Sequence, residues 1–194
     1  MGSPTLYYVR HGQTDWNAEL RFQGQKDIPL NALGRRQARE NGERLAALLG
    51  RAEGLDFVAS PLGRARETME IVRAQMGLAP DDYRVDARLI EASYGTLEGT
   101  TLPELKRVAP QLHRHRKQSR WTFLPPEGES HAMVLERVLP WYASIERDTV
   151  VCAHGVVGRV LRMHLLAIEG DKAASYVFPQ DKVFIWQPGS ERLA

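Results

Sequence analysis

The chain has 194 residues, of which 43% are hydrophobic and 26% are charged, and its formal net charge is +2. This length suits one domain with a small cap and is enough to bury a core. The small charge gives no reason to expect a nucleic-acid partner, and no apolar run is long enough to span a membrane. The lone Cys152 excludes an internal disulfide framework and fits a reducing compartment. Since no signal peptide is recognisable, we expect a cytoplasmic protein.

The first half of the chain alternates between short apolar runs and helical periodicity, with one long polar loop. Loops of this length inside a compact domain are usually functional. Ser60 has the chemistry of a helix cap, and Pro61 that of a first helical residue. The expected elements are a strand at about 5–10, a loop at 12–31 with one helical turn, a helix at about 32–49 ended by Gly50, a strand at 56–60, and a helix from 61 to about 76 stopped by Gly77.

The second half continues the alternation but contains an irregular stretch rich in Gly, Pro and charge at 94–131. Ser130 has the character of an N-cap for the helix after it. The expected elements are an extended segment at 83–89, helices near 102–108 and 110–119, a helix from 130 to about 145, a strand at 149–153, a helix at about 156–168 and a strand at 183–186.

Alternating strands and helices predict an α/β fold, a three-layer sandwich in which helices flank a mostly parallel central sheet. The whole chain, 1–194, is expected to form a single domain. The irregular stretch at about 94–131 is the best candidate for a small cap inserted over the C-terminal edge of the sheet.

Charged side chains follow several of the predicted strands. Arg10-His11-Gly12 ends the first strand, and His154-Gly155 follows the strand at 149–153. Arg64 lies in the first turn after the 56–60 strand, and Glu91 follows the 83–89 segment. Ligands of open α/β sheets bind where the strands end, so we expect these groups to converge there. Two guanidiniums, two imidazoles and one carboxylate suit a phosphate dianion.

Beyond this local chemistry, the chain resembles the histidine phosphatase superfamily, in the branch that contains phosphoglycerate mutases and small phosphomonoesterases. The matching residues keep the family's order along the chain. They are Arg10-His11-Gly12 with Asn17 and Gly24, Ser60 to Ala65 with Thr68, Leu89-Ile90-Glu91, Tyr94-Gly95, Glu98-Gly99, Gly128-Glu129-Ser130 and Ala153-His154-Gly155.

The resemblance implies a catalytic role for five of these residues. His11 would be the nucleophile that forms a phosphohistidine. Arg10, Arg64 and a protonated His154 would hold the phosphoryl oxygens. Glu91 would protonate the departing oxygen and then deprotonate the attacking water. No metal or cofactor is implied, because the arginines supply the positive charge.

The resemblance also implies four substrate-binding residues. Asn17 would add a neutral donor, and the backbone around Gln23 and Gly24 would border the phosphate and its leaving group. Tyr94 belongs to the same set. Asn17 has a second interpretation, as a residue that stabilises its own turn.

Departures from the mutase pattern favour hydrolysis over phosphoryl transfer to a second oxygen. The segment between Glu91 and His154 and the tail after it are short for a mutase. Val156 stands where mutases have Asn, and Thr100 begins a stretch without their substrate-binding lysine. We therefore expect a metal-independent phosphomonoesterase acting on a small phosphorylated metabolite, such as α-ribazole phosphate or a sugar phosphate, or with broad specificity. The alternatives are a phosphoglycerate mutase and a non-catalytic phospholigand-binding module; homodimerisation is left open.

Two features of the irregular stretch keep two interpretations each. The basic run His113 to Lys117 is either a solvated helix face or a contact for a second anionic group on the substrate. Trp121 and Phe123 either line the substrate site or anchor the cap.

Overall fold

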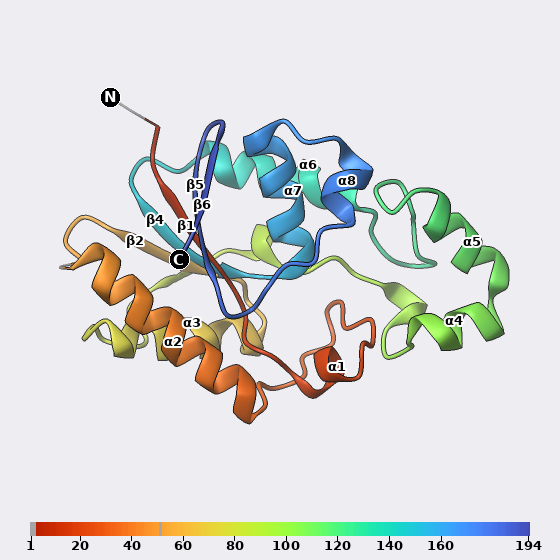
Figure 1. The fold of residues 1–194 in the computed structure, drawn as a ribbon, viewed down its shortest axis with the longest axis horizontal. Coiled ribbons are helices and arrows are strands. Elements are labelled where there is room, and N and C mark those ends of the chain that lie inside the picture. The colour runs from red at the N-terminus through yellow and green to blue at the C-terminus, as the bar shows by residue number, and fades with distance from the viewer. Residues whose placement is uncertain (1–2, 51) are drawn as a thin grey trace.

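The computed structural model describes residues 3–50 and 52–194 and has the predicted mixed α/β architecture (Figure 1). Within these residues one sheet has the strand order β3-β2-β4-β1-β5-β6. Its first four strands are mutually parallel, whereas β5 is antiparallel to β1 and β6 to β5. The strands are β1 (Leu6–Arg10), β2 (Asp56–Ala59), β3 (Arg84–Val85), β4 (Thr149–Ala153), β5 (Val183–Gln187) and β6 (Ser190–Leu193).

Helices cover both faces of this sheet, as predicted (Figure 1). On one face α2 (Ala32–Leu49) and α3 (Gly63–Gln75) pack against alternate residues of the central strands, such as Val9 and Cys152. On the other face α6 (His131–Ala143) and α7 (Gly155–Leu166) pack against Tyr8, Val151 and their neighbours. Because both faces are covered, β4 is buried along its whole length, which explains its continuous apolar sequence.

Two local predictions were wrong. Ser60 does not cap the following helix: α3 begins at Gly63, with Leu62 at the N-cap position and no side-chain cap. The segment 83–89 is not a continuous extended strand, since β3 has two residues and a 3₁₀ turn follows at Ala87–Leu89. The carboxylate of Asp86 accepts a hydrogen bond from the Arg88 backbone N–H at 2.9 Å and also pairs with the Arg88 guanidinium. This local bonding closes the turn and ends the strand.

Two short elements near the C-terminus were not predicted. Helix α8 (Gly170–Ala174) starts where the Glu169 side chain accepts hydrogen bonds from two backbone N–H groups of its first turn. Strand β6 returns along β5 after a turn in which Gly189 has a φ of +76°. The Pro-Gly pair in that turn is a sequence signal for such a reversal.

The segment 94–131 contains a 3₁₀ turn (Gly95–Leu97), α4 (Leu102–Val108) and α5 (Pro110–Gln118), so both helices expected there are confirmed. Helices α4 and α5 stand at one end of the molecule (Figure 1). The segment has its own small core of Phe22, Leu97, Leu105 and Phe123. Phe123 therefore anchors the segment internally. Trp121 packs on the main core beside Gly170, so it is an anchor as well.

The chain leaving β1 presses closely on the start of α2. Asn31 caps this helix by accepting a hydrogen bond from the Gly34 N–H at 2.9 Å. A Cβ added to Gly34 would come within 2.1 Å of the Gln13 carbonyl oxygen, and one added to Gly12 within 2.2 Å of the Gly34 carbonyl oxygen. No side chain fits between these backbones, so the two glycines fix the path of the residues that follow β1.

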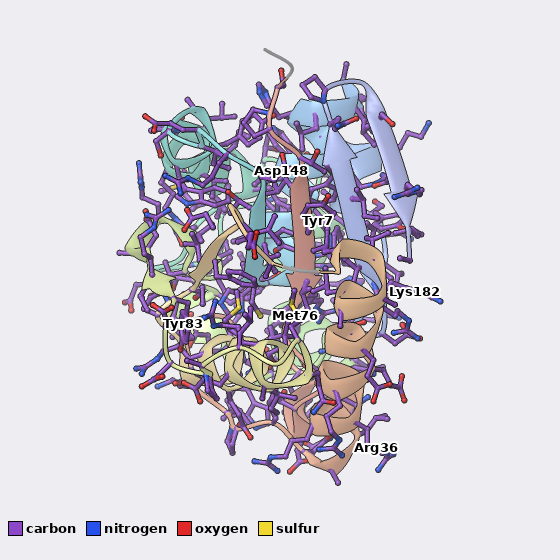
Figure 2. All side chains as sticks on the ribbon, turned by 90° about the vertical axis from the view of Figure 1, so that its left-hand side faces the viewer. Tyr7, Arg36, Met76, Tyr83, Asp148 and Lys182 are labelled. Carbon is purple, nitrogen blue, oxygen red and sulfur yellow. The ribbon has the colours of Figure 1, made fainter. Side chains whose placement is uncertain are left out.

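We expect Gly34→Ala to destabilise the protein by about 2 kcal/mol, although alanine normally favours a helix by about 1 kcal/mol over glycine. The added methyl must displace the Gln13 backbone. Thermal unfolding checks this against Arg36→Ala, since Arg36 is exposed and lies at the outer end of α2, away from Tyr7 in β1 (Figure 2). A Gly34→Ala protein as stable as the Arg36→Ala control would contradict the close approach.

Candidate active site

Three neighbouring strands deliver the candidate residues to the same edge of the sheet. Arg10 is in register with Ala153, and Ala59 with Cys152, so the residues that follow β1, β2 and β4 are adjacent. A cavity of about 140 Å³ lies at this edge. Its lining residues are Arg10, His11, Asn17, Arg21, Phe22, Gln23, Gly24, Arg64, Glu91, Tyr94, Gly155 and Arg159. Eight of the nine residues predicted for the site line the cavity.

His11 is held as a neutral imidazole. Its Nδ1 lies 2.8 Å from the Gly12 carbonyl oxygen, and since a carbonyl only accepts, Nδ1 carries the ring proton and Nε2 keeps its lone pair. Burial lowers the pKa of His11 well below 6.5, and the charges of Arg64 and Arg10 lower it further. The ring is thus prepared to act as a nucleophile through Nε2.

The ninth residue, His154, lies directly beside His11. The ring centroids are 5.1 Å apart, His154 is wholly buried, and its Nε2 lies 2.7 Å from Oγ of Ser60. Burial lowers the pKa of His154 well below 6.5, with further contributions from Arg64, His11 and Arg10. The protonated His154 that the resemblance implies is therefore disfavoured in the protein alone. A proton on this ring needs a bound anion to offset the surrounding positive charge.

Two guanidiniums border the cavity, those of the buried Arg64 and the half-buried Arg10. Arg64 donates to the carbonyl oxygens of Gly24 at 2.7 Å and of Lys26 at 2.8 Å. Arg10 donates to the Phe178 carbonyl oxygen at 2.5 Å, and its Nε has no hydrogen-bond partner among the described residues. Burial and then the nearby Arg159 lower the pKa of Arg10 to about 10. Backbone carbonyls orient both side chains, and Arg64 also lies 3.7 Å from the Asp27 carboxylate. Carbonyl contacts do not neutralise a guanidinium, so both side chains keep charge for an anion.

Glu91 is fixed through both its side chain and its backbone. Its carboxylate accepts from the Ala92 N–H at 2.9 Å and from the Val156 N–H, at the start of α7, at 3.2 Å. Its backbone carbonyl accepts from Gln25 Nε2 at 3.1 Å and from Arg137 Nη2 at 3.2 Å. The carboxylate therefore has a defined position on the cavity wall, as a general acid requires.

Asn17 combines the two roles that its sequence context allowed. Its side chain closes a capping box with Thr14 at the start of α1 (Asp15–Ala18) and also lines the cavity. The Gln23 side-chain amide lies 2.8 Å from the Thr14 hydroxyl and 3.2 Å from Asn17 Nδ2. Gly24 turns with a φ of +54°, which directs its carbonyl to Arg64. The loop after β1 is thereby tied to the site.

Tyr94 contributes to the cavity wall as part of an aromatic pair. Its ring centroid is 4.8 Å from that of Phe22.

Two residues that support the site were not predicted. Arg137 forms a two-point ion pair with Glu129, at 2.9 and 3.1 Å, and its Nη1 donates to the Arg88 carbonyl at 2.7 Å. It thus holds the backbone on which Glu91 sits. Gln180 donates from Nε2 to the His11 carbonyl and to Asn17 Oδ1, both at 3.0 Å. The Gly128-Glu129-Ser130 motif was a signal for the first of these; Gln180, far along the chain, has no local signal.

The described residues contain no group of three or more His, Cys, Asp or Glu side chains that could hold a metal ion. No described helix is long and apolar enough to cross a membrane.

Burial is the main cause of a lowered pKa at three histidines, His11, His131 and His154. For His131 the pKa falls to about 3, and Arg159, Arg116 and Arg120 contribute. Below pH 6.5 these histidines bind protons in the unfolded chain but stay neutral in the folded protein. The free energy of unfolding should therefore decrease as the pH falls from about 6.5, by about 1.4 kcal/mol per pH unit for each histidine.

Urea unfolding at pH 7.5, 6.0 and 5.0 measures this effect. In His131→Gln the free energy of unfolding should fall by about 1.4 kcal/mol less between pH 6.0 and 5.0, because one histidine with a lowered pKa has been removed. His115→Gln, at an exposed position of α5, serves as the control. If the free energy of unfolding depends on pH identically in His131→Gln and in the parent protein, the lowered pKa of His131 is disproved.

The chain is similar to known proteins over most of its length. The model of the histidine phosphatase superfamily (branch 1) matches residues 6–190. A probable phosphoglycerate mutase GpmB of Citrobacter koseri is 41% identical over 133 residues, which cover 69% of this chain and 59% of that protein. The alignment thus spans about three fifths of that relative's length.

Two further comparisons extend over more of the chain. A 2,3-bisphosphoglycerate-dependent phosphoglycerate mutase of Parvibaculum lavamentivorans is 32% identical over 183 residues, covering 92% of this chain and 80% of that protein. The structure of a mycobacterial glucosyl-3-phosphoglycerate phosphatase in complex with VO₃ superposes with a TM-score of 0.79 at 29% identity, covering 98% of this chain and 96% of that one. With the family model matching nearly its whole length, the chain belongs to the histidine phosphatase superfamily, branch 1.

Proposed function

We propose that the protein is a phosphomonoester hydrolase that works without a metal ion, through a phosphohistidine on His11. The observation that carries this proposal is the neutral, buried His11 in a cavity shared with Arg10, Arg64 and Glu91. The arginines attract the phosphate dianion and stabilise charge on its oxygens, while the imidazole keeps the lone pair that attack requires.

The reaction proceeds in two displacements at phosphorus. In the first, Nε2 of His11 bonds to phosphorus as the bond to the ester oxygen breaks, and that oxygen takes a proton from Glu91. In the second, Glu91 takes a proton from water, the water oxygen bonds to phosphorus, and the bond to Nε2 breaks to release inorganic phosphate. The fixed position of the Glu91 carboxylate supports its use as acid in one step and base in the next.

The substrate class is a small phosphorylated metabolite. A cavity of about 140 Å³ accommodates a phosphoryl group and a few neighbouring atoms. Glucosyl-3-phosphoglycerate, acted on by the mycobacterial relative, belongs to the same broad class as α-ribazole phosphate and the sugar phosphates. We propose action in the cytoplasm on free metabolites, with no nucleic-acid or membrane partner.

Replacing His11 with alanine should reduce hydrolysis of p-nitrophenyl phosphate by at least about 10³-fold, because the nucleophile is lost. His115→Ala, at an exposed position, should keep the parent rate. Acid quenching of the parent protein during turnover should trap acid-labile phosphate on His11. Retained activity in His11→Ala would refute the mechanism, and phosphate binding without turnover in the parent protein would instead identify a non-catalytic phospholigand-binding module.

Phosphoglycerate mutase activity is a second candidate, because both curated relatives described above carry that name. A mutase must shield its phosphohistidine from water. Here Val156 occupies the position of the mutase asparagine, and its N–H is engaged by Glu91. We therefore favour water as the acceptor.

With 3-phosphoglycerate as the substrate, the released product should be inorganic phosphate, with formation of 2-phosphoglycerate at least about tenfold slower. Phosphorus NMR separates the two products in one reaction. Faster appearance of 2-phosphoglycerate than of phosphate would establish the mutase instead.

A further inference from the structure

A second hollow, of about 480 Å³, lies beside α5 and α8 and plays no part in the mechanism above. It is larger than the catalytic cavity. Its lining residues are Leu102, His113, Arg116, Lys117, Gln118, Arg120, Asp171 and Ser175. We call it the cap groove. Three residues of the basic run His113 to Lys117, for which the sequence allowed two interpretations, line this groove.

The cap groove carries excess positive charge. Arg116, Lys117 and Arg120 form no ion pair with a carboxylate in the part of the chain that the structure describes. The acid of the groove, Asp171, is engaged elsewhere: its Oδ1 accepts from the Trp121 N–H at 2.9 Å and from the Ser119 hydroxyl at 3.0 Å. One carboxylate committed to fixing the backbone does not balance three cationic side chains.

The guanidiniums of this region also repel one another. Arg116 is half-buried, and burial, Arg120 and Arg159 all lower its pKa. The pKa of His131 falls to about 3 through burial and the same three arginines. Three arginine charges thus converge on one region, where the Asp171 carboxylate opposes only part of them. Such an arrangement costs free energy in the protein alone and is offset when an anion binds between the charges.

The cap groove adjoins the catalytic cavity. Arg116 places its Cζ 5.3 Å from the ring centroid of Phe22, and Phe22 lines the catalytic cavity. Arg159 lines the same cavity and acts electrostatically on Arg116. The positive charge therefore extends from the phosphate site towards the groove.

We propose that the cap groove binds a second anionic group, a carboxylate or a phosphate, carried by the leaving part of the substrate. This inference rests on the proposed hydrolase function and narrows its substrate class to phosphomonoesters with two separated anionic groups. The catalytic cavity takes the phosphoryl group that is transferred, and Arg116, Lys117 and Arg120 hold the distal anion by charge-assisted hydrogen bonds.

Two pairs of substrates distinguish the effect of a distant carboxylate from that of a carboxylate close to the phosphate. In the long pair, 6-phosphogluconate and sorbitol 6-phosphate differ by a carboxylate at the far end of a six-carbon chain. In the short pair, 3-phosphoglycerate and glycerol 3-phosphate differ by a carboxylate close to the phosphate. The parent protein should prefer 6-phosphogluconate over its partner by about tenfold in kcat/KM, chiefly through KM, since one charge-assisted contact has about this effect.

The double variant Lys117→Gln/Arg120→Gln tests the groove directly. Its preference within the long pair should fall to about twofold or less, while its preference within the short pair changes little. The matched control, Arg107→Gln/Arg114→Gln, removes two exposed charges from α4 and α5 outside the groove and should keep the parent ratios. No long-pair preference in the parent protein, or an undiminished preference in the groove variant, overturns the proposal.

Binding measurements keep this result separate from the fate of the proposed function. In a His11→Ala background, calorimetry should give a Kd for 6-phosphogluconate about tenfold lower than for sorbitol 6-phosphate, and the groove substitutions should abolish the difference. If the parent protein hydrolyses neither p-nitrophenyl phosphate nor any of these esters, the hydrolase proposal fails, yet this difference in Kd still supports the groove. Equal Kd values for the two compounds count against the groove even when hydrolysis is normal.

Discussion

The structure depends on keeping two arginines and two histidines close together at one edge of the sheet, where the described residues include a single ion pair for this group, between Arg64 and Asp27. Arg10 and Arg64 are oriented by backbone carbonyl oxygens, and burial, with the arginine charges, lowers the pKa of His11 and His154 so that both stay neutral. The result is a site with a strong net attraction for an anion and a free imidazole lone pair. Both properties arise from one arrangement, because burial lowers the pKa of His11 and the arginine charges that attract an anion lower it further.

The rest of the fold supplies the rigidity that this arrangement needs. Parallel pairing of β1, β2 and β4 brings three strand ends to one edge. The close approach of Gly12 and Gly34 fixes the residues after β1. Arg137, ion-paired with Glu129, holds the backbone of Glu91 by donating to its carbonyl oxygen. Buried charges in a low-dielectric site remain effective only where neighbouring groups cannot relax around them.

The sequence was sufficient to predict the α/β architecture and the meeting of His11, Arg64 and His154, because both follow from strand periodicity and from the residues at or just after strand ends. Glu91 joins them although it follows a 3₁₀ turn and not the predicted extended segment. The predictions that failed did so for physical reasons. Ser60 has the chemistry of a helix cap, but its hydroxyl contacts His154, a partner 94 residues away. Gln180 reaches His11 from the other end of the chain, and the charge state of His154 depends on arginines brought close only by folding. Local patterns do not encode such contacts.

The position of β1 has a consequence for the order in which the site forms. This strand pairs with β4 and with β5, which both follow it far along the chain. Residues Phe178 and Gln180, just before β5, provide the contacts that orient Arg10 and His11. During synthesis His11 therefore leaves the ribosome long before the groups that position it. A chain truncated before Phe178 would hold every residue predicted for the site but would lack the two contacts, from Phe178 and Gln180, that orient Arg10 and His11.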